Sequence, residues 1–491
     1  MPRRASDPFD PSSADSRQRR VIGPWSATGI SIAAMIGSGI FAVTGEIGAS
    51  LGSTTNVLLA WILGGVVALA GAISLAEVAS MRPRASAQYV VVHEALGPTL
   101  GYLNGMITLV VGYLAANAAV ALIAGAYVRT AIPELDERIT ATILLVLLGA
   151  QHATFVRGGK RLNDSLVLLK LGVILLLILG GGWVLLVSGV PTWLPSEAVL
   201  EAARAADPTS SLATIPAGAT APETIAHLRA AATPSLASGA LGAAVVTVTF
   251  AYLGWSNAAD VAGELREPSR SVPIAVVGSV VIVGVLYVLV NLVYLAVVPP
   301  AAMVEVGADG RLRPMTGIGA VVATHLFGPD GGRVLVVAIV FLLMSTLSVG
   351  IMTCGRVIAG MSWQGQLPTS LGGLNPQGAP TLAIALLTAA SVAIAWISGL
   401  RSLLEYVGIL VTVASSLAMI AAMVLRWRRP EAPRPFRMPL HPLPPLVALG
   451  LGGWIILASG VADWRPLAAS AATIAVMLAA RPFLRARAVG G

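Results

Sequence analysis

The chain has 491 residues, of which 56% are hydrophobic and only 11% are charged. Its mean hydropathy is +0.83. This composition excludes a soluble globular protein. A single-helix membrane anchor is excluded as well, because apolar runs of about twenty residues, each enough to cross a bilayer, recur along the sequence.

Twelve such apolar stretches follow one another in the chain. We therefore expect an all-α polytopic membrane protein with twelve transmembrane helices. Residues 1–20 are polar, carry arginines and prolines and lack the apolar run of a signal peptide, so they predict a disordered tail. The two long loops, 189–237 and 299–331, have room for short surface helices but for no soluble domain. The predicted spans are 23–49, 55–81, 99–128, 138–156, 163–188, 238–263, 271–298, 332–360, 380–399, 402–426, 443–461 and 465–481.

The basic charges predict how the chain is oriented in the membrane. With the N-terminus inside, twenty of the 31 Lys and Arg residues fall in cytoplasmic segments and nine in outer ones, and Lys170 and Arg356 lie within spans. This asymmetry follows the positive-inside rule, so we expect a multi-pass protein of the cell (inner) membrane with both termini cytoplasmic. The net charge of +8 is then a signature of topology and not of nucleic-acid binding. The single cysteine, Cys354, lies within a span, which excludes a disulfide-linked partner.

The most informative local feature is a glycine-rich break in the first span, Gly37-Ser38-Gly39-Ile40-Phe41. Within hydrocarbon an unbroken helix pairs all its own backbone groups, so irregular backbone persists only where it is buried in protein or lines a polar cavity. A second break, Phe250-Ala251-Tyr252-Leu253-Gly254-Trp255, lies five spans later. Glycine also serves close helix packing in membranes, but paired breaks in two halves of opposite orientation are typical of the binding site of a secondary transporter.

An odd number of spans per repeat orients the two copies oppositely in the membrane. We therefore predict a first inverted repeat at 21–190 (helices 1–5) and a second at 238–428 (helices 6–10). The cytoplasmic tail 1–20 precedes the first repeat, and an outer loop, 191–237, separates the two. Helices 11 and 12 and a cytoplasmic C-terminus occupy 429–491.

Several motifs give the chain a resemblance to the amino acid–polyamine–organocation superfamily of permeases. The run Ile36-Gly37-Ser38-Gly39-Ile40-Phe41 is similar to the Gly-(Ser/Ala/Thr)-Gly-Ile-Phe signature of that superfamily. The continuation Thr44-Gly45-Glu46 resembles the cationic amino acid transporter branch and its bacterial relatives. Further similar stretches begin at Ala76, Phe250 and Glu264, and Arg434-Pro435-Phe436-Arg437-Met438-Pro439 resembles the loop before span eleven. The resemblance implies a five-plus-five inverted-repeat, leucine-transporter-like fold with helices 1 and 6 broken.

The resemblance also implies a substrate site at the two breaks. The substrate carboxylate would meet backbone amides, and its amine would meet backbone carbonyls. Helix ends agree with this assignment, because N-termini present free N–H groups and partial positive charge whereas C-termini present carbonyls. Phe250 would also act as an aromatic gate. The predicted binding residues are Gly37, Ser38, Gly39 and Ile40 around the amides, and Ile36, Phe250, Ala251 and Leu253 around the carbonyls.

Lys170 is an ionisable residue well inside the fifth predicted span. A charged group in the bilayer is by default a functional hypothesis, although Lys170 lies within snorkelling reach of the polar span end near Asp164. The resemblance places its ammonium where sodium-coupled relatives bind a cation, bridging spans one and eight. Its expected partners are carbonyls near Ile36 and Gly37 together with Ser345 or Ser348. Burial disfavours the charged form of lysine, so Lys170 is a candidate for proton coupling or for a fixed positive strut.

The remaining candidates divide between the membrane and its cytoplasmic side. Glu46 lies beyond the first break, where it would either recognise a cationic side chain or be hydrated from an outer vestibule. Asn117, Met344, Ser348 and Tyr406 come from spans expected to face the pocket, where ordinary packing explains them equally well. Glu77 with Arg82 or Arg84, and Glu264 with Arg266, are expected to form cytoplasmic gate or loop pairs.

We therefore expect a secondary active transporter that moves amino acids by alternating access, is sodium-independent and is coupled to protons. An obligate amino acid or polyamine exchanger is the alternative. A membrane-embedded enzyme or a channel fits less well, because the five histidines are scattered over loops and span edges. We expect no cofactor and no metal, and the sequence contains no nucleotide-binding Gly-x-x-x-x-Gly-Lys-Ser/Thr motif. The expected partners are the substrate, protons and the lipid bilayer.

Overall fold

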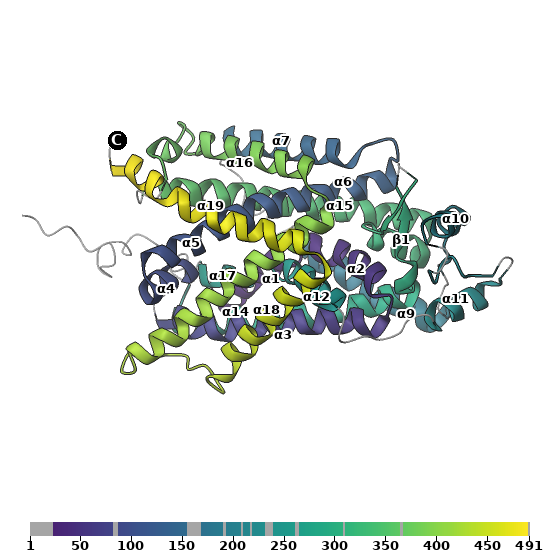
Figure 1. Ribbon diagram of the computed structural model, residues 1–491, viewed down its shortest axis with the longest axis horizontal. Coiled ribbons are helices and arrows are strands. Elements are labelled where there is room, and N and C mark those ends of the chain that lie inside the picture. Colours follow the sequence, from purple (N-terminus) through teal and green to yellow (C-terminus); the bar gives the residue numbers. More distant parts are fainter. Residues whose placement is uncertain are drawn as a thin grey trace, which may run out of the picture.

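A computed structural model of the chain gives its architecture (Figure 1). It describes residues 23–81, 87–154, 168–189, 193–207, 210–216, 219–230, 239–260, 265–307, 310–363 and 367–489. The predicted tail 1–20 and the residues Arg82, Arg84, Asp164 and Glu264 lie outside these ranges.

Over these ranges the protein consists almost entirely of helices, with one small antiparallel hairpin in which Val304 pairs with Pro314. The hairpin strands are β1 (Val304–Val306) and β2 (Leu312–Pro314). Two π-helical segments, η1 and η2, interrupt long helices, and η4 and η5 are single 3₁₀ turns. The helices are α1 (Pro24–Met35), α2 (Ser38–Leu51), α3 (Thr54–Met81), α4 (Ala87–Leu96), α5 (Pro98–Leu109), η1 (Val110–Ala115), α6 (Ala116–Ala131), α7 (Glu137–Thr154), η2 (Leu176–Gly180), α9 (Gly181–Ser188), α10 (Glu197–Ala206), α11 (Ala221–Ala230), α12 (Gly239–Ala251), α13 (Asn257–Asp260), α14 (Pro268–Val297), η4 (Pro300–Ala302), α15 (Ile318–Trp363), η5 (Thr369–Gly372), α16 (Thr381–Ile397), α17 (Leu400–Arg428), α18 (Leu443–Ala462) and α19 (Trp464–Val489).

The class of a polytopic helical membrane protein is confirmed. Helix lies over each of the twelve predicted stretches, as far as those stretches are described. Seven described helices are long and apolar enough to cross a bilayer, and the bent pair α1–α2 makes an eighth. Four of the twelve stretches hold helices that do not meet that test alone, among them the 13-residue α12 and the 17-residue α16. Twelve complete crossings and the inverted repeat therefore remain predictions.

The loops hold more structure than the sequence indicated. The loop 189–237 contains α10 and α11, as expected. The loop 299–331, which also had room for short surface helices, contains the 3₁₀ turn η4 and, in addition, the β1–β2 hairpin and the first turns of α15. Helix α15 bends at Gly328, which has a positive φ of 75°, and its long apolar part follows that bend. In addition, α4 forms a separate helix between the second and third predicted spans.

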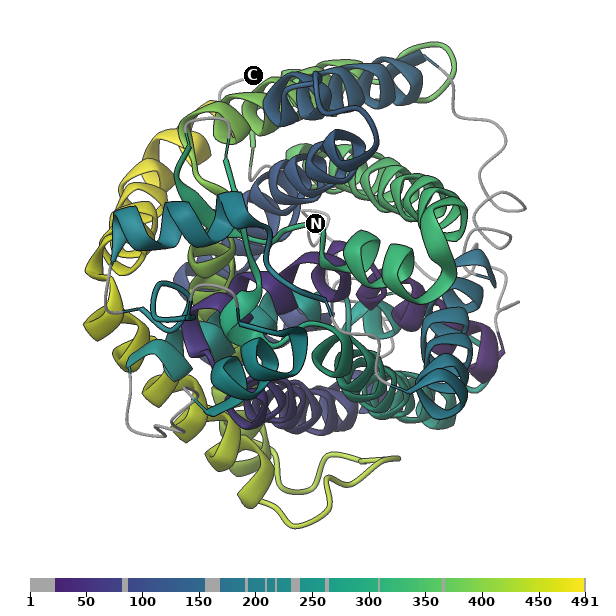
Figure 2. The same cartoon turned by 90° about the vertical axis from the view of Figure 1, so that its right-hand side faces the viewer.

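The broken helices lie in the middle of the bundle. In Figure 1, α1, α2 and α12 are surrounded by α3, α14, α15 and α17, with α4 at one end and the hairpin, α10 and α11 at the other. Figure 2, viewed from the hairpin end, shows the other helices arranged in a ring around this centre. The side chains of Phe41, Ile40 and Tyr287 in this region are fully buried.

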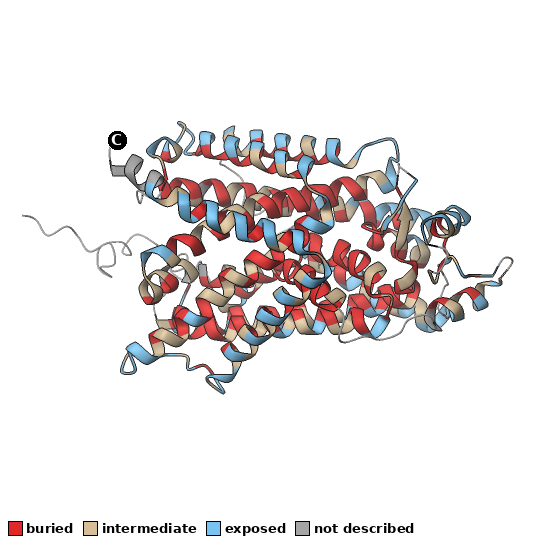
Figure 3. Ribbon diagram, in the orientation of Figure 1, coloured by how far each residue is buried: buried red, intermediate tan, exposed pale blue. Residues whose placement is uncertain are grey.

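The outer surface of the ring is apolar, as a lipid-facing surface must be. Figure 3 shows buried residues along the inner faces of the helices and exposed residues along the outer faces. Those exposed positions include Leu186, Ile397 and Val461, which are 86%, 82% and 83% accessible. Large apolar side chains exposed in such numbers mark a surface that a membrane covers.

Candidate functional site

The first break separates α1 from α2, whose axes differ in direction by 41°. Helix α1 ends at Met35, and the amide of Ile36 still donates to Ile32 O at 2.8 Å. Gly37 then leaves the helical conformation, with φ −137° and ψ −141°, and α2 begins at Ser38 without a side chain that caps its amides. The backbone N–H groups in the first turn of α2 therefore have no acceptor carbonyl within their own helix.

The second break follows α12, which ends at Ala251. Residues 252–256 form turns in which Leu253 N donates to Phe250 O at 3.1 Å and Asn257 N donates to Gly254 O at 3.0 Å. The short helix α13 then begins at Asn257 and packs on α1 and α4, whereas α2 packs on η4 and β2 at the other end of the bundle. The two broken helices therefore run in opposite directions past each other.

Close approaches of small residues hold the two breaks together. A Cβ placed on Gly39 would lie 2.4 Å from both Cα and Cβ of Ala251. A Cβ on Gly254, where φ is +99°, would lie 2.6 Å from the Cβ of Ala34. Only residues without a Cβ permit these contacts, and Gly254 also has a backbone conformation that other residues rarely adopt. The glycines therefore have a packing role and expose backbone at the same time.

Tyr287 of α14 bridges the two breaks from behind. Its hydroxyl lies 2.6 Å from Met35 O and 2.9 Å from Ala251 O, and the side chain is fully buried. Trp61 and Tyr252 pack edge-on against its ring at centroid distances of 5.1 and 5.3 Å. A carbonyl from each broken helix is thus paired with the same side chain.

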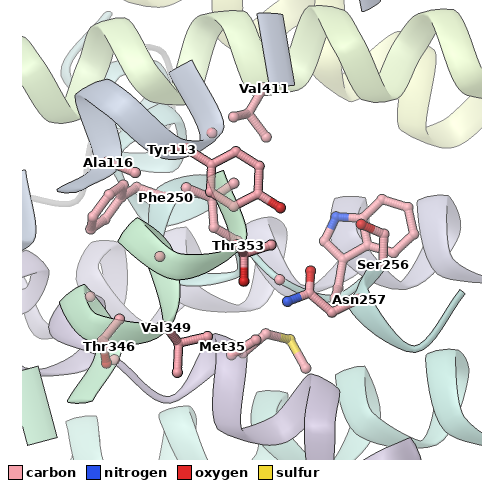
Figure 4. A pocket seen from close by; sticks show the side chains of 18 of the residues that line it. Met35, Tyr113, Ala116, Phe250, Ser256, Asn257, Thr346, Val349, Thr353 and Val411 are labelled. Carbon is pink, nitrogen blue, oxygen red and sulfur yellow. The ribbon is translucent and has the colours of Figure 1, made fainter. Parts of the chain in front are cut away.

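A cavity of about 260 Å³ lies in front of the two breaks. Its walls come from α1, α2, α5, η1, α6, α12, α15 and α17, together with the turn after α12. Figure 4 shows Tyr113 and Phe250 on one side of it and Ser256 and Asn257 on the other. Gln88 of α4 and Asn257 of α13 also line it, so the cavity extends from the breaks toward the α4 end of the bundle.

The structure brings together five of the eight residues predicted at the breaks. Gly37, Ser38, Gly39, Phe250 and Leu253 line the cavity. Ile36, Ile40 and Ala251 are buried behind it. The predicted carbonyls of Phe250 and Ala251 already have neighbours, namely Leu253 N and the Tyr287 hydroxyl.

Lys170 lies on the helix Leu168–Ser188 and is 5% exposed. Its Nζ donates to Ala33 O and to Thr346 Oγ1, each at 3.0 Å, and thus joins α1 to α15. An acceptor carbonyl near Ile36 and Gly37 was expected, and the one found belongs to Ala33, about one turn earlier on the same helix. The hydroxyl partner is Thr346, so the expected Ser345 or Ser348 was wrong. Ser345 and Ser348 point elsewhere because successive residues of a helix are turned by about 100°, and Ser348 instead lies 2.7 Å from His152 Nε2.

Asn117 and Thr346 are polar residues of the cavity wall. Asn117 was expected to face the pocket and does line it, and its Nδ2 is buried without a hydrogen-bond partner among the described residues. Thr346 was missed, because a threonine in an apolar span carries no local signal of function. Met344 and Tyr406 do not line the cavity, and the Tyr406 hydroxyl lies 3.0 Å from Thr473 Oγ1.

Glu77 forms a buried ion cluster at the α4 end of the bundle. Its carboxylate accepts from Arg426 Nη1 at 2.8 Å, Arg434 Nε at 3.2 Å and Met438 N at 2.7 Å. These contacts tie α3 to the end of α17 and to the loop that follows it. The sequence had paired Glu77 with the neighbouring Arg82 or Arg84, whereas its described partners come from more than 300 residues away.

Two helices interrupted where they lie against each other, with helix ends around a partly polar cavity, define a class of membrane protein that binds a small solute within the bilayer. A model of the amino acid permease family matches residues 22–479, and the chain belongs to this family of the amino acid–polyamine–organocation superfamily. Like its relatives, it is a transport protein and not an enzyme.

The relatives found by sequence comparison are transporters and exchangers from bacteria and mammals. The chain is 25% identical to the serine/threonine exchanger SteT of Bacillus subtilis over 456 residues, which cover 91% of this chain and 92% of SteT. It is 25% identical over 448 residues to the rat large neutral amino acids transporter small subunit 2, covering 90% of this chain and 76% of that protein. It is also 24% identical to the methylthioribose transporter of B. subtilis, with 93% of each chain covered.

Proposed function

We propose that this permease is a sodium-independent secondary transporter that moves neutral amino acids across the cytoplasmic membrane by alternating access. The observation that carries the proposal is the cavity in front of the two breaks, which the uncapped N-terminus of α2 faces. Free amides and a partial positive charge at a helix N-terminus favour a carboxylate. The carboxylate of the substrate would therefore bind at Gly37, Ser38 and Gly39.

The cavity wall supports neutral substrates over cationic ones. Among the described residues that line it, Lys170 is the only charged side chain and no carboxylate is present. A cationic side chain would thus meet a positive charge and no counter-ion. The unpaired Asn117 Nδ2 offers a hydrogen bond to a polar side chain, while Phe250, Val349 and Val411 offer apolar contact. The names of the relatives, which include a serine/threonine exchanger and a large neutral amino acid transporter, support the same substrate class.

Lys170 supports the absence of a sodium requirement and a coupling to protons. Its ammonium joins α1 to α15 through neutral acceptors, and no described carboxylate forms an ion pair with it. A fixed ammonium between these helices can replace a bound sodium ion as the positive charge that joins them. A buried charge held only by neutral groups is costly, so gain and loss of its proton can be linked to breakage and formation of the α1–α15 contact.

The segregation of basic residues supports an inward-facing conformation. Arg426, Arg429, Arg434 and Arg481 make their contacts at the α4 end of the bundle, toward which the cavity extends. By the positive-inside rule this end would be cytoplasmic.

The proposal is tested by uptake of labelled L-serine and L-leucine into proteoliposomes. We expect uptake without sodium that is stimulated several-fold by an inward proton gradient, and loss of that stimulation in Lys170→Ala. Lys160→Ala, which removes a lysine ten positions earlier in the sequence, is the matched control and should retain it. Absence of any amino acid movement, with or without a gradient, would contradict the proposal as a whole.

An obligate exchanger is the second candidate, and the name of SteT favours it. In that case uptake would require an amino acid inside the vesicles and would be indifferent to the proton gradient. Lys170 would then be a fixed strut, and Lys170→Ala would slow exchange without altering its pH dependence. Counter-flow measured in vesicles loaded with unlabelled serine separates the two modes.

A further inference from the structure

A second cavity, which we call the outer cavity, lies at the hairpin end of the bundle. It has a volume of about 350 Å³ and shares no lining residue with the cavity at the breaks. Helices α2, α6 and α7, both hairpin strands and the turn between α16 and α17 contribute to its wall. Its charged lining residues are Glu46, Glu137, Arg138, Glu305, Arg313 and Arg401.

Several charges in and beside the outer cavity are already matched with one another. Arg129 forms ion pairs with Glu137 at 2.8 Å and with Glu305 at 3.0 Å, and so joins α6 to α7 and β1. Arg401 Nε lies 3.1 Å from Glu405 Oε1 on the same helix. Burial raises the pKa of the Glu305 carboxyl, and the nearby Arg129 opposes that shift. These pairs hold the hairpin against the helices and form a framework around the cavity.

Glu46 takes part in none of these ion pairs. Its side chain is 5% exposed, and Oε1 accepts only a long hydrogen bond of 3.4 Å from Thr316 Oγ1. Oε2 has no hydrogen-bond partner within the described parts of the chain. An unpaired acceptor on a buried charged group costs more than an ordinary lost hydrogen bond. Because Glu46 lines the outer cavity, a small rotation of its buried carboxylate would present this unused acceptor to a ligand that carries N–H donors.

The rim of the outer cavity carries the opposite charge. Arg138 on α7 is an exposed lining residue outside the ion pairs named above, and Arg401 on α17 is exposed as well, with its Nε directed at Glu405. A bare metal ion would need several oxygen ligands and would be repelled by these guanidinium groups. A molecule with an ammonium group at one end and a carboxylate at the other matches this wall. Its ammonium suits Glu46, and its carboxylate suits the arginines, because guanidinium groups bind carboxylates well.

We propose that the outer cavity is a second binding site for an amino acid, in which the ammonium donates to Glu46 Oε2 and the carboxylate faces Arg138 and Arg401. This inference rests on the proposed function, since the ligand is the transported substrate before it reaches the breaks. Nothing in the central cavity takes part in it, because the two cavities have separate walls.

Helix α2 connects the two sites. Glu46 lies eight residues beyond Ser38, which corresponds to about 12 Å along the helix. Between them, the Tyr127 hydroxyl donates to Phe41 O at 2.7 Å and accepts from Gly319 N at 3.2 Å, with both aromatic side chains fully buried. This packed layer separates the outer cavity from the breaks. An amino acid would therefore occupy the outer site before the layer opens, and release from it would accompany movement of α2.

The test compares transport from the two faces of the membrane. Right-side-out and inside-out vesicles that contain the wild type or Glu46→Gln are supplied with labelled L-serine or L-leucine. We expect the KM measured at the outer face to rise about tenfold in Glu46→Gln, the loss expected for one hydrogen bond to a charged group. The KM at the inner face should change less than twofold. Glu197→Gln, which removes an exposed carboxylate of α10 on the same side, should leave both values unchanged.

Competition at the outer face assigns the two ends of the ligand. Propylamine should inhibit wild-type uptake, and this inhibition should disappear in Glu46→Gln. Propionate should also inhibit wild-type uptake, and this inhibition should disappear in Arg138→Gln. Because Arg138 is exposed, Arg138→Gln also serves as the second variant if Glu46→Gln folds poorly. An equal rise of KM at both faces, or no rise at either, overturns the outer site. A wild type that moves neither amino acid from either face instead overturns the proposed function.

Discussion

Substitution of Gly39 by alanine tests whether contact between the broken helices controls the protein. An alanine Cβ at this position would lie 2.4 Å from the Cα and Cβ of Ala251, about 1 Å closer than carbon atoms pack. Backbone atoms cannot rotate away, so α2 and α12 would have to separate. Overpacking of this kind costs about 1–3 kcal/mol. We expect a lower unfolding temperature in detergent and at least tenfold slower amino acid uptake.

Gly29→Ala is the matched control for this substitution. Gly29 lies in α1, and a Cβ there would meet no atom within 4 Å. Both substitutions gain about 1 kcal/mol of helix propensity, so the difference between the two variants isolates the cost of the close approach. We expect Gly29→Ala to be as stable as the wild type or slightly more stable, with normal uptake. If Gly39→Ala matches Gly29→Ala in both measurements, the helix crossing does not constrain transport and our reasoning is refuted.

Two other substitutions probe the contacts that fix the broken helices and the α4 end. Tyr287→Phe removes the hydroxyl beside Met35 O and Ala251 O, so both carbonyls lose a buried partner. The free energy of unfolding should fall by about 1–3 kcal/mol, which a lower unfolding temperature would report. An unchanged unfolding temperature would show that other donors replace the hydroxyl. Glu77→Gln leaves two arginines of a buried cluster without their counter-ion and should cost about 3–5 kcal/mol. The same measurement on Asp330→Asn, which breaks an exposed pair with Arg333, should show no change.

The positions of the helix breaks could be predicted from the sequence because their signal is local. Gly37, Gly39 and Gly254 lie within a few residues of the points where α1 and α12 end. The apolar stretches likewise predict helices because chain length and hydropathy alone set the requirement for crossing a bilayer. Neither inference needs information about which helices are neighbours.

The contacts across the bundle could not be predicted, because they depend on helix rotation and on distant parts of the chain. Lys170 was assigned to the correct pair of helices but to the wrong residues, since a rotation of one residue moves a side chain by about 100°. Tyr287 lies in an apolar span with no motif around it, yet it contacts both breaks. Glu77 was paired with adjacent arginines because sequence proximity was the only guide available.

The hairpin shows a different reason for a missed element. Strands of three residues, Val304–Val306 and Leu312–Pro314, are too short for alternation of polar and apolar residues to be visible. Their position is fixed by tertiary contacts, since Met303 packs on Gly48 and the carbonyl of Met315 packs on Gly45. The outer cavity exists only because these contacts place the hairpin over α2, so the sequence could not reveal it.

The contacts at the breaks also change which backbone groups of the two broken helices are expected to bind the substrate. The resemblance implied that the substrate amine meets carbonyls of both broken helices, from Ile36 and from Phe250, Ala251 and Leu253. In the structure, Ala33 O accepts from Lys170, and Met35 O and Ala251 O lie against Tyr287. These carbonyls therefore anchor the breaks to neighbouring helices. The amides that begin α2 have no such partner from a capping side chain, so recognition at the breaks is expected to depend more on the substrate carboxylate than on its amine.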